Sequence, residues 1–450
     1  MSTPRTFTLT FTGDVMLGRL IDQLLPEHVN NPQDKEVATS FISKHPSILG
    51  QGNYTPSSPW GTTLSLFQAS DLNIINLETA VTTTPERWPN KKYNYRMHPA
   101  NLAPILHAAQ IDYANLANNH VLDFGSEGLV ETAWTLKSAR IAFSGAGETT
   151  NEAFKPVELA LPRKTLLKHG CARIGTSSDT TGTITTIAPE STRTQAGDSG
   201  ARYLPVHIYS ASDHPQDWGS VPNFHLIDYS PSTRDRLRRL LLSNGVAEYP
   251  GETDSKSDTH HDQPKPGDHD NESTQSRRNN AHVPALKILS IHWGPNYIWK
   301  PEDRIRSLAH FLVDECGVDI VHGHSSHHVQ GVEVYRGKII IYGCGDFVDD
   351  YVLHPEFRND LGAVWRVVCR EKVVGGPRER EREGKGLLGL SPVRLEIFPT
   401  RIDKFRAMLL DSGDVDHNWV WGRVGALSRD LDTRVRGELG EEGQIIVDIE

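Results

Sequence analysis

Chemically capable polar side chains follow five strand-like apolar runs of this 450-residue chain. They lie in the segments Thr12-Gly-Asp14, Asn76-Leu-Glu78, Ala117-Asn-Asn-His120, His292-Trp-Gly294 and His322-Gly-His324-Ser-Ser-His327-His328. This mixture of carboxylate, amide and imidazole donors, without cysteine, is the set that Zn, Mn, Fe and similar divalent ions accept. Two adjacent ions that share such ligands activate a water molecule and neutralise charge on a phosphoryl or acyl oxygen. The five segments together therefore predict a divalent metal centre.

Each segment taken alone has a simpler interpretation. Gly13-Asp14 is typical of a turn, Asn118 or Asn119 can cap a helix, and His292 can be a hydrogen-bonded histidine of the core. Four imidazoles within residues 322–328 are harder to explain by packing, although we expect one or two of them to be structural or exposed. The metal interpretation is favoured because all five segments share one position, the end of a strand.

An alternation of strands and helices must position these side chains. Alternating or short apolar runs predict strands at 7–11, 73–76, 111–116, 286–291, 318–321, 338–342, 363–368 and 393–398. Apolar residues at helical spacing predict helices over 102–109, 129–141 and 305–316, with a terminal helix near 416–434. This order predicts an α/β fold whose sheet is at least partly covered by helices. In such sheets ligands bind outside the carboxyl ends of the strands, which is where the polar segments fall.

Composition suggests one domain with insertions. Residues 251–280 contain no aliphatic or aromatic side chain, so we expect a disordered insertion over 251–282. The alternating charges of 375–386 predict a solvated loop. We assign 5–400 to a single domain and 401–450 to a C-terminal helical extension.

Charge and hydropathy exclude several classes of protein. With 37% hydrophobic and 23% charged residues, the chain has an ordinary globular composition. It has no apolar run of about 18 residues, so we expect no membrane segment. A net charge of −10 without a basic block argues against a nucleic-acid partner. Four widely spaced cysteines, with no leader-like segment before residue 6, predict buried reduced thiols in a cytoplasmic protein.

The motifs also resemble those of a known family. The segments Thr12-Gly-Asp-Val-Met-Leu-Gly-Arg19, Asn76-Leu-Glu78, Leu116-Ala-Asn-Asn-His120, His292-Trp-Gly294 and Gly323-His-Ser-Ser-His327, followed by Asp346-Phe347, resemble the CapA family in type and order. These capsule or poly-γ-glutamate synthesis proteins are related to calcineurin-like metallophosphoesterases. The resemblance spans about residues 5–360. It implies a four-layer αββα sandwich, with two sheets between helices and a metal centre at strand ends.

The resemblance also assigns roles to individual residues. It implies the following metal ligands, with Glu78 in the place of a bridging ligand: Asp14, Glu78, Asn119, His292, His324 and His327. His120 takes the place of a catalytic histidine that protonates the leaving atom. Arg19 and Arg96 occupy positions where a guanidinium holds an anionic substrate, although a salt bridge explains either arginine equally well.

The chain departs in three respects from metallophosphoesterases or from common bacterial members of the family. Position 16 is Met, where metallophosphoesterases usually have a histidine, and the CapA family shares this loss. The block Gly323-His-Ser-Ser-His327 replaces Gly-His-His-Pro-His, and Gly345-Asp-Phe347 replaces Gly-Asn-Phe, which indicates a distinct subgroup. Bacterial capsule proteins of this family are typically tied to a membrane, and we expect no anchor here.

Two functions follow as hypotheses. The first is a metal-dependent hydrolase that attacks a phosphoester or a γ-glutamyl-type amide of an anionic small molecule or polymer. The alternative is a non-catalytic accessory protein that holds an anionic polymer. A purely structural metal domain fits poorly, because closed structural zinc sites usually use cysteine.

Overall fold

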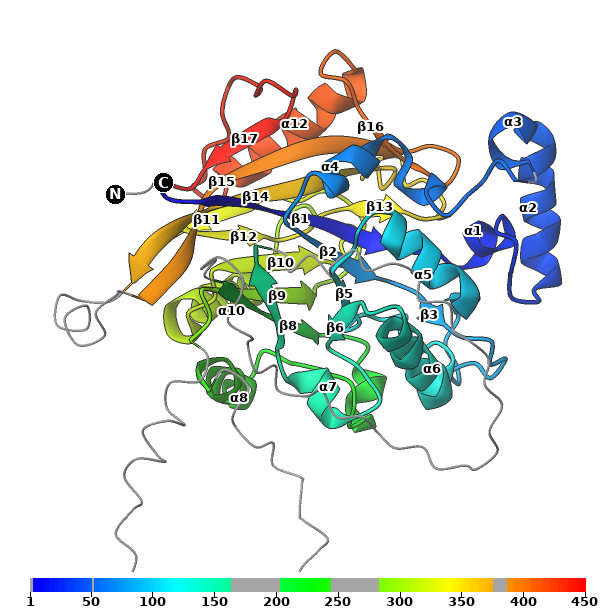
Figure 1. Ribbon diagram of the computed structural model, residues 1–450, viewed down its shortest axis with the longest axis horizontal. Coiled ribbons are helices and arrows are strands. Elements are labelled where there is room, and N and C mark those ends of the chain that lie inside the picture. Colours follow the sequence, from blue (N-terminus) through cyan, green and yellow to red (C-terminus); the bar gives the residue numbers. More distant parts are fainter. Residues whose placement is uncertain (1–2, 51, 163–202, 244–282, 375–386) are drawn as a thin grey trace, which may run out of the picture.

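Two β-sheets lie face to face in the computed structural model, which describes residues 3–50, 52–162, 203–243, 283–374 and 387–450 (Figure 1). The first sheet has nine strands in the order β16-β15-β14-β1-β2-β5-β6, with β13 beside β1 and β17 beside β15. The second has six strands in the order β11-β12-β10-β9-β8-β7. The predicted insertion at 251–282 and the predicted loop at 375–386 lie outside the described residues.

The strands of the first sheet are β1 (Thr6–Val15), β2 (Leu72–Leu77), β5 (Tyr113–Asn115), β6 (Ala142–Ser144), β13 (Asp346–Val348), β14 (Leu361–Val374), β15 (Leu387–Ile402), β16 (Ala407–Leu409) and β17 (Ile445–Asp448). Those of the second are β7 (Val157–Leu161), β8 (Leu204–Ser212), β9 (Leu286–His292), β10 (Ile320–His324), β11 (Val332–Tyr335) and β12 (Lys338–Ile341). A short separate pair consists of β3 (Ala80–Val81) and β4 (Arg96–Met97).

The α-helices are α1 (Arg19–Gln23), α2 (Pro32–Lys44), α3 (Pro46–Leu49), α4 (Leu64–Gln68), α5 (Pro99–Ala108), α6 (Gly125–Ser138), α7 (Thr150–Phe154), α8 (Pro231–Leu242), α10 (Asp303–Cys316) and α12 (Val415–Arg429). Two 3-10 helices, η1 (Ser58–Thr63) and η2 (Gln216–Ser220), lie between them. The predicted helices and strands are therefore present at the expected places.

Three apolar layers show that the architecture is a four-layer αββα sandwich. One layer joins the first sheet to α4, α5 and α6, the second fills the space between the sheets, and the third joins the second sheet to α8 and α10. Strand β9 contributes side chains to two of these apolar layers. Its Ile288 belongs to the middle layer, whereas Leu289 and Ile291 belong to the outer one, because successive side chains of a strand point to opposite faces. The predicted fold class is confirmed.

The C-terminal region is joined to this sandwich. Residues 401–450 contain α12, and they also supply β16 and β17, which pair with β15 in the first sheet. Helix α12 buries Val420 and Val424 in the apolar layer between the sheets. The expected helical extension is thus built partly of strands and shares the core.

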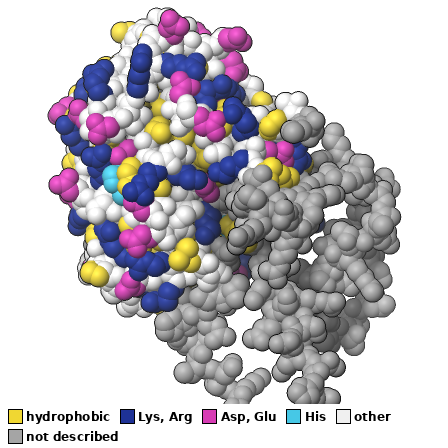
Figure 2. All heavy atoms as spheres, turned by 90° about the vertical axis from the view of Figure 1, so that its left-hand side faces the viewer, with side chains coloured by type: hydrophobic (Ala, Val, Ile, Leu, Met, Phe, Trp, Pro, Cys, Tyr) yellow, Lys and Arg dark blue, Asp and Glu magenta, His cyan; other side chains and the backbone are white. Residues whose placement is uncertain are grey.

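Two surface observations bear on partners. No helix among the described residues is long and apolar enough to cross a membrane. On the face shown in Figure 2, Lys and Arg side chains lie interspersed with Asp and Glu side chains.

Of the four cysteines, Cys316, Cys344 and Cys369 are buried free thiols, and Cys171 lies outside the described residues.

Candidate metal centre

The first sheet places a row of polar side chains at one edge. Strand β1 runs parallel to β13 and β2, and its Asp14 is the register partner of Asp346 on one side and of Asn76 on the other. Asn76 is in turn the partner of Asn115 in β5. The carboxyl ends of β1, β2 and β5 and the first residue of β13 therefore line up four carboxylate or amide side chains across the sheet.

Gly13 permits the close approach that this row requires. A Cβ atom at this position would lie 1.9 Å from the carbonyl oxygen of Gly345, so no other residue fits without moving the backbone. The strand segment before Asp346 can therefore pack directly against β1. Gly13 lies within a strand, so the turn interpretation of Gly13-Asp14 does not apply.

The second sheet contributes imidazoles. His292 at the end of β9 and His324 at the end of β10 are register partners, and their Nδ1 atoms lie 2.9 Å apart. His327 follows in a tight loop in which Ser325 and His327 have φ values of 99° and 62°. A positive φ is strained for residues other than glycine and is common at functional sites. The loop thereby turns His327 back toward the first sheet, where its Nδ1 lies 2.8 Å from Asp346 Oδ1.

The two rows converge on two groups of ligand atoms. In the first group, atoms of Asp14, His292 and His324 all lie within 4.8 Å of one another; the second group contains Asp14, Glu78 and His327 under the same limit. All five residues are buried. We call these five residues the metal centre. Asp14 belongs to both groups, whereas the resemblance places Glu78 in the bridging position.

Several atoms of this region lack the hydrogen bond that burial normally demands. Among the described residues no donor or acceptor reaches these buried atoms: Asp14 Oδ2, Glu78 Oε1, Asn119 Oδ1, His292 Nε2 and Asp346 Oδ2. Buried polar atoms are nearly always paired, so five such atoms in one region point to a missing partner. Four of the five are acceptor oxygens, which a divalent cation satisfies. The donor set therefore fits a metal ion.

The electrostatics of the site agree with this fit. Burial, followed by the neighbouring charge of Asp14, raises the pKa of Glu78 and the pKa of Asp346 well above their usual range. Burial also lowers the pKa of His292 and the pKa of His324 well below the usual value. Clustered carboxylates oppose ionisation, and a cation between them reverses that effect. Lowered pKa values favour the neutral imidazoles of His292 and His324, the form that metal ligation requires.

Asn76 and Asp346 are parts of the site to which our sequence analysis gave no role. Asn76 Nδ2 donates to Asp14 Oδ1 at 2.8 Å and to Glu78 Oε2 at 3.3 Å, which leaves the other oxygen of each carboxylate free. Asp346 orients His327 through the contact at its Nδ1. A carboxylate behind a ligating histidine fixes the ring orientation in many metal sites. The motif residues on which the resemblance rested included both positions, so the signal was present.

His120 sits beside the metal centre in a fixed orientation. Its Nδ1 lies 2.7 Å from Asp123 Oδ2, and its Nε2 lies 4.0 Å from Glu78 Oε1. Lys91 donates to the other oxygen of Asp123. The His120 ring stacks on Tyr95, with centroids 4.1 Å apart. Burial lowers the pKa of His120 to about 4, although the Asp123 charge acts in the opposite direction.

The two asparagines before His120 have different environments. Asn118 Oδ1 accepts from the backbone N–H groups of His120 and Val121, each at 3.1 Å, so Asn118 caps the turn that carries His120. Asn119 is half-buried, and its Oδ1 is one of the unpaired atoms described above. The capping interpretation therefore holds for Asn118, and Asn119 remains our candidate for an amide ligand.

Two of the four clustered histidines are structural, as expected. His322 Nε2 lies 2.8 Å from the carbonyl oxygen of Thr12, and its Nδ1 lies 3.0 Å from Ser290 Oγ. His328 Nδ1 lies 3.1 Å from the carbonyl oxygen of Val329. Both rings are buried, and neither belongs to the two ligand groups.

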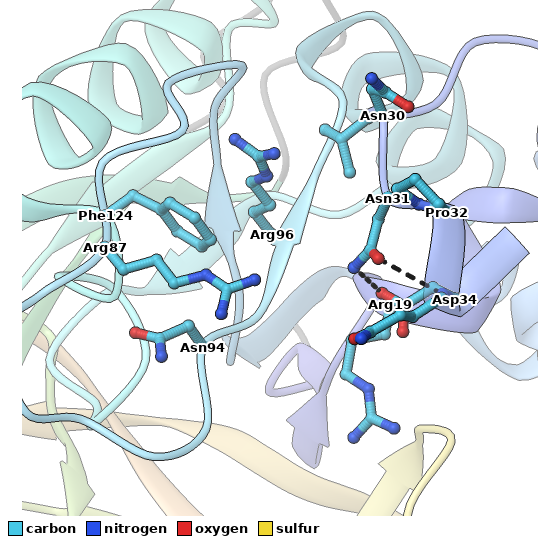
Figure 3. Close-up of a pocket in the computed structure, with 11 residues that line it drawn as sticks. Arg19, Asn30, Asn31, Pro32, Asp34, Arg87, Asn94, Arg96 and Phe124 are labelled. Atoms are coloured by element: carbon cyan, nitrogen blue, oxygen red, sulfur yellow. Dashed lines mark hydrogen bonds between the residues drawn. The ribbon is translucent and has the colours of Figure 1, made fainter.

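Arg19 and Arg96 lie outside the metal centre and line a separate pocket, which we call the arginine pocket (Figure 3). Arg19 Nε lies 3.4 Å from Asp350 Oδ2, so the salt-bridge interpretation holds in part for this residue. Arg96 has no ion pair among the described residues; its Nη1 donates to the carbonyl oxygens of Thr83, at 3.1 Å, and Thr84. A third arginine of the pocket, Arg87, was not singled out by its sequence context.

Fold and site together define a metallophosphoesterase-like α/β sandwich with a candidate metal centre. The chain belongs to the family of bacterial capsule synthesis proteins PGA_cap, whose family profile matches residues 8–351. The resemblance to the CapA family is thereby confirmed.

Two relatives show how far the sequence similarity extends. It is 31% identical over 443 residues to a probable polyglutamine synthesis accessory protein of Mycobacterium tuberculosis, covering 96% of this chain and 94% of that protein. It is 24% identical to the capsule biosynthesis protein CapA of Bacillus anthracis, covering 76% of this chain and 60% of that protein.

Two solved structures align with most of the chain. A hypothetical protein from Thermus thermophilus aligns with 89% of this chain and 96% of its own at 12% identity and a TM-score of 0.33. A phosphatase from Mycoplasma pneumoniae aligns with 90% and 94% at 11% identity and a TM-score of 0.34.

Proposed function

We propose that this protein is a metal-dependent hydrolase that cleaves a phosphoester or a γ-glutamyl-type amide of an anionic substrate. The observation that carries this proposal is the set of buried, unpaired acceptor atoms around Asp14. Burying unpaired carboxylate oxygens is costly, and a site that only stabilised the fold would pair them within the chain. The residues fit two divalent ions of the Mn, Zn or Fe type, with Asp14 shared between them.

Two groups of residues would each hold one ion. Asp14, His292 and His324 would hold one ion, and Asp14, Glu78 and His327 would hold the other, with Asn119 as a further amide ligand. When bound, such ions lower the pKa of water and neutralise developing charge on the substrate. Asn76 and Asp346 keep the ligands oriented.

His120 is placed to move a proton. Its Nδ1 faces Asp123, so its Nε2 faces the carboxylates of the metal centre and can deliver a proton to a leaving oxygen or nitrogen. The ring is neutral at rest because burial lowers its pKa to about 4. An anionic substrate beside the ring favours the protonated form and thus prepares the acid. Asp123 stabilises the imidazolium in the same way.

A second candidate is an accessory protein that binds an anionic polymer without cleaving it. It is supported by the name of the mycobacterial relative, which describes that protein as an accessory protein. In this case the metal centre would anchor carboxylates or phosphates of the polymer. His120 would then have no proton to transfer.

Metal content and turnover separate the two candidates. The first measurement is elemental analysis of the purified, untagged full-length chain. The second is hydrolysis of bis-p-nitrophenyl phosphate and of a γ-linked glutamate oligomer with Mn, Zn or Fe present. Comparison with His120→Asn, which leaves every ligand in place, identifies turnover that depends on the proton donor.

Each outcome decides between the candidates. One or two ions per chain, with hydrolysis that His120→Asn lowers by about 10²-fold or more, supports the hydrolase. One or two ions with no hydrolysis of either probe, and equal polymer binding by both forms, supports the accessory protein. A chain that neither contains nor takes up any of these metals overturns the metal centre itself.

A further inference from the structure

A second aspartate–histidine pair, Asp213 and His214, follows strand β8 of the second sheet. Ser212, the last residue of β8, is the register partner of His292, the last residue of β9. Because the two strands are parallel, the residues that follow β8 emerge at the same edge of the sheet as His292. The ring centroids of His214 and His292 lie 4.9 Å apart. Our sequence analysis gave no role to this pair.

Asp213 fixes the orientation of the His214 ring. His214 Nδ1 is hydrogen-bonded to Asp213 Oδ1. The other oxygen of this carboxylate, Oδ2, accepts from the hydroxyl of Tyr229 at 2.6 Å and from the backbone N–H of Gly294 at 2.9 Å. A carboxylate that accepts from all three groups requires the ring hydrogen of a neutral His214 to be at Nδ1. His214 therefore offers a lone pair at Nε2.

This nitrogen of His214 can be reached from solvent. It lies 3.5 Å from Ser325 Oγ, in the loop between His324 and His327. The Ser325 hydroxyl donates to the carbonyl oxygen of Gly294 at 3.2 Å, so its single hydrogen is already in use. The His214 side chain is 28% exposed and lines a pocket of about 670 Å³. A small molecule that enters this pocket can thus donate a hydrogen bond to His214.

The two aspartate–histidine pairs lie beside different ligand groups of the metal centre. His120, which Asp123 orients, faces Glu78 of one group. His214 contacts His292 of the other group. In a hydrolysis at two adjacent ions, the attacking atom and the leaving atom are stabilised at different places. One oriented imidazole is therefore available on each side of the metal centre.

We propose that His214 Nε2 accepts a hydrogen bond from the attacking water molecule and orients it, while His120 serves the leaving atom. This inference rests on the proposed function and deepens it, because it assigns the two sides of the reaction to the two ligand groups. Orienting the attacking atom accelerates the reaction, since its rotational freedom is lost before the new bond forms. Asp213 is a positioning residue that acts through His214.

Binding of two inorganic anions tests this acceptor without turnover. Near neutral pH phosphate carries an O–H group and sulfate carries none, so an acceptor at His214 favours phosphate. His214→Phe removes the acceptor and keeps a ring, whereas His214→Gln keeps an acceptor. The matched control is His310→Phe, because His310 is 27% exposed, lies 3.0 Å from Glu333 and belongs to neither ligand group. Titration calorimetry on the metal-loaded full-length chain measures both affinities.

We expect His214→Phe to lower the ratio of phosphate affinity to sulfate affinity about tenfold, as for one hydrogen bond. His214→Gln should lower it less, and His310→Phe should change it less than about twofold. In the hydrolysis of bis-p-nitrophenyl phosphate, His214→Phe should lower kcat about 10²-fold with KM within about threefold. Elemental analysis should show the wild-type metal content in all three variants.

Several results would overturn the inference. Loss of metal in His214→Phe would make His214 a metal ligand, and an unchanged affinity ratio would remove its role as an acceptor. An equal fall in the ratio in His310→Phe, or no phosphate binding by the metal-loaded wild type, would have the same consequence. Failure of the hydrolase proposal would appear separately, as an absence of cleavage while the phosphate preference still depends on His214.

Discussion

The metal centre and the arginine pocket lie on either side of Tyr95 and differ in burial and in the kind of polar group that they contain. The metal centre is buried and collects acceptor atoms, and the side chains of Glu78 and Asp346 are completely inaccessible. The arginine pocket is open and collects donors, and the side chain of Arg19 remains 32% exposed. The metal centre has no positively charged ligand, whereas in the arginine pocket three arginines outnumber the one acidic lining residue, Asp34. Their proximity suits a ligand that carries negative charge in both places.

The difference in burial decides what each region requires. Buried carboxylates without partners are costly, so we expect a cation at the metal centre to stabilise the fold. Half-exposed guanidinium groups retain much of their hydration, so the arginine pocket tolerates being empty. We therefore expect the ions to be resident and the anion to exchange. The following predictions test this distinction.

Loss of the shared carboxylate should have the largest effect. Asp14→Asn should abolish binding of both ions and lower any hydrolysis by about 10³-fold or more, because both ligand groups include Asp14. His324→Ala should remove only one of the two ions, because His324 belongs to one group. Elemental analysis of the purified variants measures the stoichiometry. His322→Gln is the control, since this buried histidine of the same strand lies in neither group; equal metal loss there would contradict the assignment.

Loss of the partner of His120 should have the next largest effect. Asp123→Asn keeps all five residues of the metal centre but removes the charge that orients His120 and stabilises its protonated form. Turnover should fall by about 10²-fold while the metal content is unchanged. Steady-state kinetics and elemental analysis on one preparation check both parts. Wild-type turnover in this variant would show that His120 works without its carboxylate, and metal loss would show that the two regions are not independent.

A smaller effect should follow from loss of charge in the arginine pocket. In the cleavage of a γ-linked glutamate oligomer, Arg87→Gln should raise KM about tenfold with kcat within about twofold, because binding of a remote carboxylate acts before the chemical step. Initial rates over a range of oligomer concentrations separate the two constants. Arg434→Gln, which removes an exposed arginine that does not line this pocket, should have neither effect. A fall in kcat alone would place Arg87 in the chemical step and contradict the division between the two regions.

The smallest effect concerns a buried histidine outside both regions. Burial lowers the pKa of His225 to about 3, and its Nδ1 is bonded to the carbonyl oxygen of Ser210 at 2.6 Å. Its ordinary pKa is about 6.5, so between pH 6.5 and 3 the unfolded chain binds more protons than the folded one. The stabilising contribution of neutral His225 is therefore fully present above pH 6.5 and is lost as the pH falls. At pH 5 the free energy of unfolding should be lower by about 2 kcal/mol, which corresponds to about 2 °C in Tm.

Calorimetry at pH 7 and pH 5 measures this loss, with the metal removed so that competition between protons and the ion does not contribute. His225→Gln cannot titrate, so its Tm should fall less between the two pH values than that of the wild type. An equal fall in both proteins would assign the acid sensitivity to other buried groups.

The sequence predicted the alternation of strands with helices and the convergence of polar strand ends because both follow from local patterns. The four-layer arrangement came from the resemblance to the CapA family. Alternation of apolar residues marks the strands, and residues such as Asp14 and His324 come directly after apolar runs. The ligand types could also be read from the motifs. The structure assembles all the predicted metal ligands with ionisable side chains, and it leaves Asn119 half-buried with an unpaired oxygen.

What sequence reasoning could not determine depends on the pairing of distant strands. The shared position of Asp14 results from its placement between β13 and β2, and no local pattern specifies those neighbours. The role of Asn76 depends on the same register. Arg87 joins the pocket because the segment between β3 and β4 folds beside α2, and its sequence context of Pro, Glu and Trp carries no signal of this.

The origin of the metal ligands in two sheets also has a consequence for folding. Asp14 lies in the first strand of the chain, whereas His292 and His324 lie in β9 and β10 of the other sheet. Closing so long a loop is entropically unfavourable and slow, so these groups meet only after the sheets have docked. A partly folded chain thus has no complete site and cannot retain an ion tightly. Metal uptake during refolding should therefore be a late event that reports the finished sandwich.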